Sequence, residues 1–163
     1  MLKIPTVLYS ISLIFLFGNA VLAESSALFE NRIDRLRMEL RKESMLSINR
    51  SSTECHFLTL VDKDPGCATA GARIFVERSL RRLNKAVSPE LPEPININEQ
   101  LSHLTFKKVL PSSKALVLAR FTTIANEAAH GAQFDSPNLR GLLIEDMPKV
   151  LAFLEEILLK IRI

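Results

Sequence analysis

Apolar residues recur every three or four positions along much of this chain, with charged residues between them. The earliest such stripe predicts an amphipathic helix over residues 26–47, because this spacing places its members on one side of a helix: Phe29, Ile33, Leu36 and Leu40. A short helix is expected at residues 56–61, followed by a helix breaker at residues 62–66. The next stripe predicts a helix over residues 67–86 and comprises Ala72, Val76, Leu80, Leu83 and Val87.

Prolines and capping residues divide the second half of the chain. Three prolines within residues 88–97 predict an extended connector, because proline disfavours helix at its own position and at the preceding one. Asn98 is expected to cap a helix that ends near Val109, and Ser113 a helix that ends near His130.

The last predicted helix is the most strongly apolar. Ser136 followed by Pro137 is a typical helix start, a capping residue and then proline in the first turn. Pro148 should kink or restart this helix, because it cannot donate a backbone hydrogen bond. The stripe of this helix contains Leu143, Met147, Val150, Leu151, Leu154, Leu158 and Ile161.

No stretch shows the alternation of apolar and polar residues that predicts a strand, and no repeat is evident. We therefore expect an all-α fold, a bundle of four to five helices. The predicted organisation is a signal segment at residues 1–23, an N-terminal amphipathic helix within residues 24–50 and a helical bundle at residues 51–163.

Residues 1–23 have the pattern of a secretory signal peptide. Lys3 precedes a short apolar run, Gly18 breaks the run, and small residues precede a cleavage site after Ala23. Cleavage there would export the protein, to the periplasm or the medium. The alternative is an uncleaved membrane anchor at residues 7–23, which the basic residues that follow would favour through the positive-inside rule.

Cys55 and Cys67 are the two cysteines of the chain. An even count in an exported protein predicts one disulfide, and closing a loop of this length would stabilise the fold by about 3 kcal/mol. Two buried free thiols or one reactive thiol are the alternatives. A reactive thiol needs an activating base, and His56 is adjacent only in sequence. These residues are also too few for a metal site.

Composition argues against several classes of function. Removal of residues 1–23 leaves a net charge of +2, which is too small for a dedicated nucleic-acid-binding protein, so a nucleic-acid partner is not expected. The chain has no tryptophan and five glycines, which argues against base-stacking surfaces and glycine-rich phosphate loops. We therefore expect no cofactor and no metal.

A polar pair lies where the helix before the last one ends. Asn126 and His130 occur in the sequence Asn-Glu-Ala-Ala-His-Gly, ahead of a polar turn and the apolar last helix. This pattern resembles HEPN-type helical-bundle domains, together with an Asp-Pro pair that opens an arginine-rich helix and a short helix before Pro111. The resemblance covers roughly residues 58–161 and implies a HEPN-like bundle.

Catalytic HEPN proteins are ribonucleases, in which one helix carries an arginine, a polar residue and a histidine. In this chain Asn126 and His130 match the last two, but Ala125 stands at the arginine position and Arg120 lies roughly 15 Å from His130 along the helix. The resemblance thus implies a degenerate motif, and we expect no catalytic residues. Asn126 and His130 then either stabilise the helix end or form a polar site that contacts a ligand.

A row of cations follows one face of the helix predicted at residues 67–86. Its members lie at positions i, i+3, i+4 and i+7: Arg78, Arg81, Arg82 and Lys85. Such a row is commonly a solvated face, here paired with Glu77 or Glu127, but it would also bind an acidic protein surface or anionic lipid. The acidic residues of the last helix are expected at the surface: Glu145, Asp146, Glu155 and Glu156.

These observations favour an exported, non-catalytic helical bundle that acts by protein interaction or self-association. Its partner would be an envelope protein or a second copy of the chain, since the apolar stripes of the first and last helices could continue across a homodimer. The alternatives are a HEPN-type ribonuclease with a degenerate motif and a membrane-anchored bundle.

Overall fold

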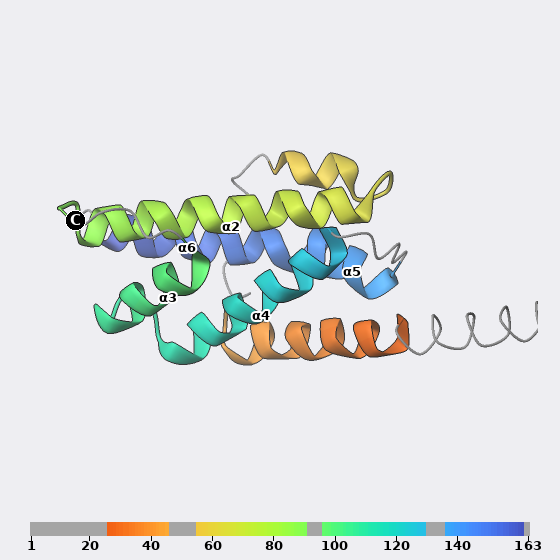
Figure 1. Ribbon diagram of the computed structural model, residues 1–163, viewed down its shortest axis with the longest axis horizontal. Helices are drawn as coiled ribbons and strands as arrows, with labels where there is room; N and C mark the ends of the chain where they lie inside the picture. The colour runs from red at the N-terminus through yellow and green to blue at the C-terminus, as the bar shows by residue number, and fades with distance from the viewer. Residues whose placement is uncertain (1–25, 46–54, 91–95, 130–135, 162–163) are drawn as a thin grey trace, which may run out of the picture.

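The computed structural model describes residues 26–45, 55–90, 96–129 and 136–161, and these form helices and the turns between them (Figure 1). An N-terminal helix covers residues 26–42. The later elements are the 3₁₀ helix η1 (His56–Leu60), α2 (Pro65–Val87), α3 (Ile97–Phe106), α4 (Ser112–Ala129), α5 (Pro137–Gly141), the π turn η2 (Leu142–Asp146) and α6 (Met147–Ile161). The predicted all-α bundle is confirmed for these residues.

The helices pack in layers around α2. The long helices α2 and α6 lie side by side, with η1 on the outer side of α2 (Figure 1). Helix α4 packs against α2 and crosses toward the N-terminal helix, while α3 packs against both α2 and α4. The C-terminal end of α3 therefore lies at the opposite end of the bundle from residue 26 (Figure 1).

The predicted apolar stripes form the core. All four members of the first stripe are buried, as are Ala72, Val76, Leu80 and Leu83 of α2 and the stripe of α6 as far as Leu158. Burial of each large apolar side chain is worth about 1.5–3 kcal/mol, so these stripes supply most of the driving force for folding. Because one chain already covers them, they are not available to continue across a homodimer.

Helix α2 begins two residues earlier than the sequence pattern predicts. The carboxylate Oδ1 of Asp64 accepts a hydrogen bond from the backbone N–H of Cys67 (2.9 Å), and Pro65 occupies the first turn. Proline fits there because the first N–H groups of a helix have no partner within it. Residues 62–66, predicted as a helix breaker, thus include the start of α2.

Two predicted caps are wrong. Asn96 caps α3 in place of Asn98, since its Oδ1 accepts from the backbone N–H of Glu99 (2.9 Å). The Ser113 hydroxyl donates to Glu43 Oε2 (2.6 Å) and so ties α4 to the end of the N-terminal helix. Side chains that can cap are also good partners for a neighbouring helix, and sequence alone does not separate the two uses.

The segment from α5 to α6 is one helical rod with a π turn in the middle. Ser136 accepts a hydrogen bond from the backbone N–H of Leu139 (3.0 Å), which confirms the predicted start. The π turn η2 ends just before Pro148, whose ring would clash with the carbonyl of Ile144 in a regular α-helix. The wider turn relieves this clash, so Pro148 disturbs the helix as predicted without ending it.

A buried ion pair joins the N-terminal helix to this π turn. Arg37, whose side chain is 15% exposed, donates from Nε to Asp146 Oδ2 (2.6 Å) and from Nη2 to Glu145 Oε2 (2.6 Å). Gly141 lies directly under the guanidinium, where a Cβ atom would overlap it. Burial lowers the pKa of Arg37, but the hydrogen bonds and charges of Asp146 and Glu145 together raise it above its usual value.

The expectation that all the acidic residues near the last helix lie at the surface is therefore wrong for Asp146. Its side chain is 2% exposed, because the π turn directs it toward Arg37 rather than to solvent. Glu155 also has a structural role, in an ion pair with Arg82 of α2.

The predicted disulfide between Cys55 and Cys67 is also wrong, and both thiols are free. A Cβ atom on Gly71 of α2 would lie 2.8 Å from the Cβ of Phe57, so η1 packs closely on α2 at that point. Cys55 precedes Phe57, whereas Cys67 lies one turn before Gly71 in α2, which returns antiparallel to η1. The two cysteines thus fall on opposite sides of this contact, outside the short separation that a disulfide requires.

Among the residues that the structure describes, no helix is long and apolar enough to cross a bilayer. Both the signal segment at residues 1–23 and the alternative anchor at residues 7–23 lie outside the described residues.

We expect Asp146→Ala to lower the free energy of unfolding by about 3 kcal/mol, because it leaves the Arg37 cation buried with only the exposed Glu145 as partner. Urea unfolding followed by circular dichroism would measure this loss. Glu145→Ala is the matched control, with an expected loss below about 1 kcal/mol. Equal losses in the two variants would contradict the role assigned to Asp146.

Candidate functional site

The structure places Asn126 on the surface of α4, where an arginine from another helix holds it. Arg73 of α2 donates from Nη1 to Asn126 Oδ1 (2.5 Å) and from Nη2 to Glu77 Oε1 (2.8 Å). His130, the other half of the predicted polar pair, lies outside the described residues. Of the pair, the structure therefore describes only Asn126, which is hydrogen-bonded to Arg73 of α2.

The helix α4 lacks the arginine of the HEPN ribonuclease motif, but an arginine of α2 lies beside Asn126. Arg120, the nearest upstream arginine on α4, pairs with Glu39 of the N-terminal helix and is not beside Asn126. Arg73 is beside Asn126, and its Nε is buried without a partner. Sequence spacing along α4 could not reveal this residue, because it comes from α2 and meets Asn126 only through helix packing.

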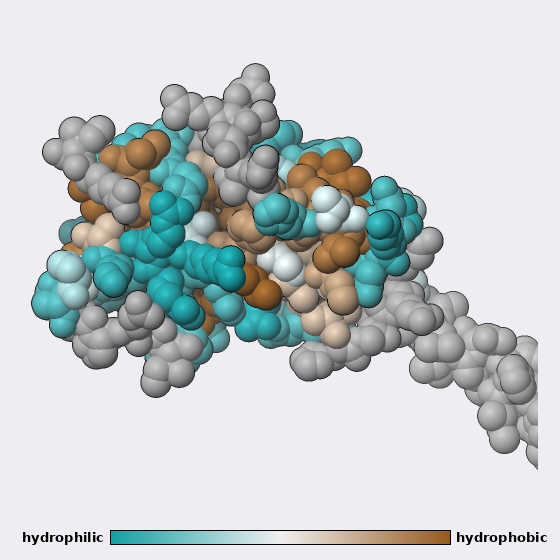
Figure 2. Space-filling view, turned by 90° about the horizontal axis from the view of Figure 1, so that it is seen from above, coloured by the Kyte–Doolittle hydropathy of each residue, from teal (hydrophilic) through white to brown (hydrophobic). Residues whose placement is uncertain are grey.

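The predicted anion-binding row lies on the exposed side of α2. Arg78, Arg81, Arg82 and Lys85 are all exposed, and Figure 2 shows hydrophilic side chains gathered on the face of the bundle that α2 occupies. Arg82 is paired with Glu155 of α6. The two partners expected for the row are engaged elsewhere, Glu77 with Arg73 and Glu127 with Arg32. The row is thus exposed to solvent, and Glu155 of α6 neutralises part of its positive charge.

Neither thiol has the properties of a nucleophile. Burial raises the pKa of Cys55. The hydrogen bond and the negative charge of Asp64 raise the pKa of the exposed Cys67 thiol. Since the thiolate is the reactive form, both shifts reduce reactivity at neutral pH.

A buried polar network joins the end of α2 to α3. Asn84 donates from Nδ2 to the carbonyls of Leu80 (2.8 Å) and Gln100 (3.3 Å), so its Oδ1 is the acceptor for His103 Nδ1 (2.6 Å). His103 therefore donates from Nδ1, and its Nε2 lies 3.4 Å from the Ser88 hydroxyl. Sequence analysis missed this network, although Asn84 is a lone amide beside the apolar stripe of α2.

The order hydroxyl, imidazole and amide is also that of a serine nucleophile with its base and orienting group. Ser88 is only 3% exposed, however, and it caps the C-terminus of α2. A substrate cannot reach a hydroxyl so enclosed. The network instead satisfies buried polar groups and holds α3 against α2.

A groove between α3 and α4 is lined by both apolar and polar side chains. Its volume is about 620 Å³. We call it the α3–α4 groove, and its lining residues are Asn98, Leu101, Ser102, Thr105, Phe106, Ser112, Ala115, Leu116 and Ala119.

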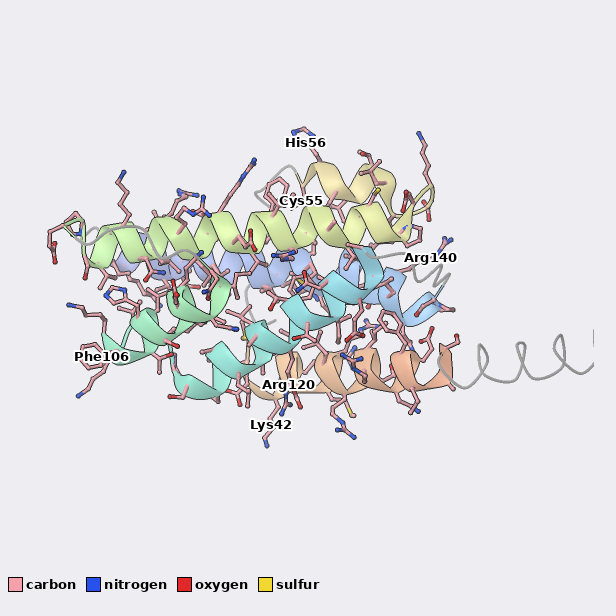
Figure 3. The ribbon with its side chains drawn as sticks, in the orientation of Figure 1. Lys42, Cys55, His56, Phe106, Arg120 and Arg140 are labelled. Carbon is pink, nitrogen blue, oxygen red and sulfur yellow. The ribbon has the colours of Figure 1, made fainter. Side chains whose placement is uncertain are left out.

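Two large apolar side chains stand open at this groove. Phe106 is 82% exposed and Leu116 is 53% exposed. Figure 3 shows Phe106 at the end of α3, on the outside of the molecule. Single exposed apolar residues are common, but a phenylalanine and a leucine that share one concave surface are typical of a binding site.

The turn that closes the groove contains an unusual backbone. Lys108 has a φ of 58° and follows the end of α3, where the N–H groups of Lys108 and Val109 donate to the carbonyls of Thr105 (3.0 Å) and Leu104 (2.9 Å). This is the Schellman pattern, in which glycine is favoured at the left-handed position. A lysine there destabilises the fold by about 1 kcal/mol relative to glycine.

The N-terminal helix ends with the same pattern. Ser44 has a φ of 55°, its N–H donates to the carbonyl of Arg41 (3.0 Å), and Met45 donates to that of Leu40 (3.2 Å). The described residues thus include two equivalent strained turns, one at the groove and one away from it.

A smaller hollow of about 250 Å³ lies between the N-terminal helix and α4, lined in part by Arg32, Arg35 and Arg120. Arg32 pairs with Glu127 and Arg120 pairs with Glu39, so most of its positive charge is already neutralised. This hollow is a weaker candidate than the α3–α4 groove.

No group of three or more metal-binding side chains occurs among the residues that the structure describes. Comparison with known proteins finds no family model, no curated protein and no solved structure that matches the chain. The α3–α4 groove, identified from geometry, is therefore the main basis for a functional proposal.

In the native protein we expect an alkylating reagent to label Cys67 slowly and to label Cys55 only after unfolding, as intact-mass analysis would show. Asp64→Asn should speed labelling of Cys67 several-fold, because it keeps an oxygen for the helix cap but removes the charge that raises the thiol pKa.

Asp62→Asn is the matched control, since Asp62 pairs with Arg140 and not with the thiol. Its labelling rate should equal that of the wild type. A native protein with no free thiol would contradict the separation of the two cysteines.

Proposed function

We propose that the protein is an exported, non-catalytic, HEPN-like helical bundle that acts as a protein-interaction module, with the α3–α4 groove as its binding surface. The single observation that carries this proposal is the exposure of Phe106 and Leu116 on one concave surface. Export rests on the N-terminal sequence, and the HEPN likeness on the sequence pattern of residues 58–161.

The groove provides enough binding energy for a specific contact. Covering Phe106 and Leu116 would contribute about 1.5–3 kcal/mol for each side chain. Aromatic residues near the centre of an interface often dominate its affinity, so Phe106 is the expected anchor. Its aromatic ring contributes nothing to the core of the isolated chain, which makes a role in binding the better explanation of its exposure.

The chemistry of the remaining candidates supports a non-catalytic role. The two thiols are protonated at neutral pH, and the Ser88 hydroxyl is enclosed. The cations of the α2 row are exposed to solvent, in part paired with α6. None of these groups combines access with an activating partner.

A photo-crosslinking phenylalanine analogue placed at position 106 should form a discrete adduct with a partner in cells that make the protein. Leu116→Asp should reduce that adduct about tenfold or more, because it introduces a charge into the apolar groove without touching the core. Mass spectrometry would identify the adduct, and circular dichroism would check that helix content is unchanged.

The same analogue at Ile144 is the matched control, since Ile144 is exposed and apolar but lies outside the groove. The control should not give the position-106 adduct. Equal adducts from the two positions, or an adduct that Leu116→Asp leaves unchanged, would contradict the interaction function.

One observation favours a second candidate, a HEPN-type ribonuclease. The motif on α4 has Ala125 at the arginine position, but Arg73 of α2 places a guanidinium beside Asn126. Such a cation could bind a phosphate, although Glu77 and Asn126 already engage it. The candidate is weaker than the interaction module for that reason.

The ribonuclease candidate requires that the protein cleave RNA without added metal and that Arg73→Ala and His130→Ala abolish cleavage. Arg78→Ala is a control of equal charge change on the same helix, and it should leave any activity intact. We expect no cleavage by the wild type, and cleavage that depends on Arg73 and His130 would overturn the non-catalytic proposal.

A further inference from the structure

We infer that the α3–α4 groove binds an amphipathic helix of a partner protein, and that this helix carries acidic residues at the end that lies over the α3–α4 turn. The inference rests on the proposed interaction function and adds the shape, length and charge of the partner. It follows from the spacing of the lining residues, the small side chains among them and the cations at one end.

The groove presents two helix faces with the same spacing. On α3 the lining positions include 98, 101, 102 and 105, and on α4 they include 112, 115, 116 and 119. Each set follows the order i, i+3, i+4, i+7, which is the spacing that packs one helix against another. Two such faces side by side form a surface on which a third helix would pack.

The floor of the groove is suited to close approach of a helix. Ala115 and Ala119 are small, and the hydroxyl of Thr105 donates to the Leu101 carbonyl (2.8 Å) rather than into the groove. Small residues allow helix axes to approach closely, and the exposed Phe106 offers a large apolar contact beside them.

Polar side chains line the edges. The side chains of Asn98, Ser102 and Ser112 form no hydrogen bond with any described residue, so they can bond to a ligand. The ten residues of α3 span about 15 Å, which matches just under three turns of a bound helix.

Charge sets the direction of the bound helix. Lys107 and Lys108 are exposed at the turn that closes the groove, and neither forms an ion pair with a described residue. Lys114 points elsewhere, since its Nζ lies 4.5 Å from the ring centre of Phe153. The acidic residue of α3, Glu99, lies at the far end of the groove. A helix with carboxylates over the turn would therefore be attracted in one orientation.

The side chain of Lys108 is open to a partner. It is exposed and forms no ion pair with a described residue. Its left-handed backbone favours glycine, so Lys108→Gly removes the cation without adding backbone strain.

The same observations favour a partner helix over two other occupants. The described residues of a second copy offer no continuous apolar stripe, because the stripes of the N-terminal helix and α6 are buried in its own core. A lipid bilayer has no periodicity to match the helical spacing of the two lining sets, which a partner helix would match.

Two synthetic helical peptides of about 14 residues, four turns, would test the inference. Each carries one leucine and alanine face, and one has glutamates at a single end where the other has lysines. Fluorescence anisotropy would give the affinities for the purified full chain, and amide chemical shifts would locate the bound peptide.

We expect the acidic peptide to bind at least about tenfold tighter than the basic one at low salt, with shifts in α3 and α4 and a smaller difference at high salt. Lys108→Gly should weaken the acidic peptide about fivefold while raising the midpoint of urea unfolding. Ser44→Gly is the matched control, since it relieves the same backbone strain away from the groove. It should raise the midpoint and leave affinity unchanged.

The outcomes separate this inference from the proposed function. If Phe106→Asp abolishes binding of both peptides but Lys108→Gly leaves the affinity for the acidic peptide unchanged, the interaction site stands and the acidic partner is overturned. If neither peptide binds and the position-106 analogue forms no adduct, both proposals fail. A Phe106-dependent dimer in sedimentation, or Phe106-dependent binding to vesicles of anionic phospholipid, would replace the partner helix with a second copy or a lipid surface.

Discussion

The buried guanidinium of Arg37 is the constraint on which the arrangement of the helices most depends. A cation removed from water must be paired, and its partner Asp146 comes from the π turn more than a hundred residues later in the chain. Pro148 causes that turn, and Gly141 leaves space for the guanidinium. The N-terminal helix, the π turn and α6 therefore have a fixed relation to one another, and a change at any of these residues acts on the others.

The same requirement, that polar groups inside the bundle be paired, organises the other end of the molecule. Asn84 and His103 bond across α2 and α3, and Ser88 closes the network. Single apolar side chains remain exposed on other described helices, among them Leu28, Met38 and Leu159. The α3–α4 groove differs because Phe106 and Leu116 share one surface there, which supports its assignment as a binding site.

The candidate sites differ in how far they could be predicted. The row that begins at Arg78 was visible in the sequence, because charges on one helix face follow a simple spacing, and the structure shows that face exposed. The contact of Arg73 with Asn126 and the groove at Phe106 were not visible, because each combines residues of two helices. A partial signal existed for Asp146, which lies three residues after Leu143 and four before Val150, on the apolar side of the last helix.

The sequence by itself determined the all-α fold and the faces that form the core, since burial of an apolar stripe depends on spacing within one helix. It also located the helix start at Ser136 and the disturbance at Pro148, which are local backbone effects. Only the tertiary structure decided that the two cysteines stay apart, that Asp146 is buried and that α3 and α4 leave a groove. These depend on how helices distant in sequence pack together, which no local spacing specifies.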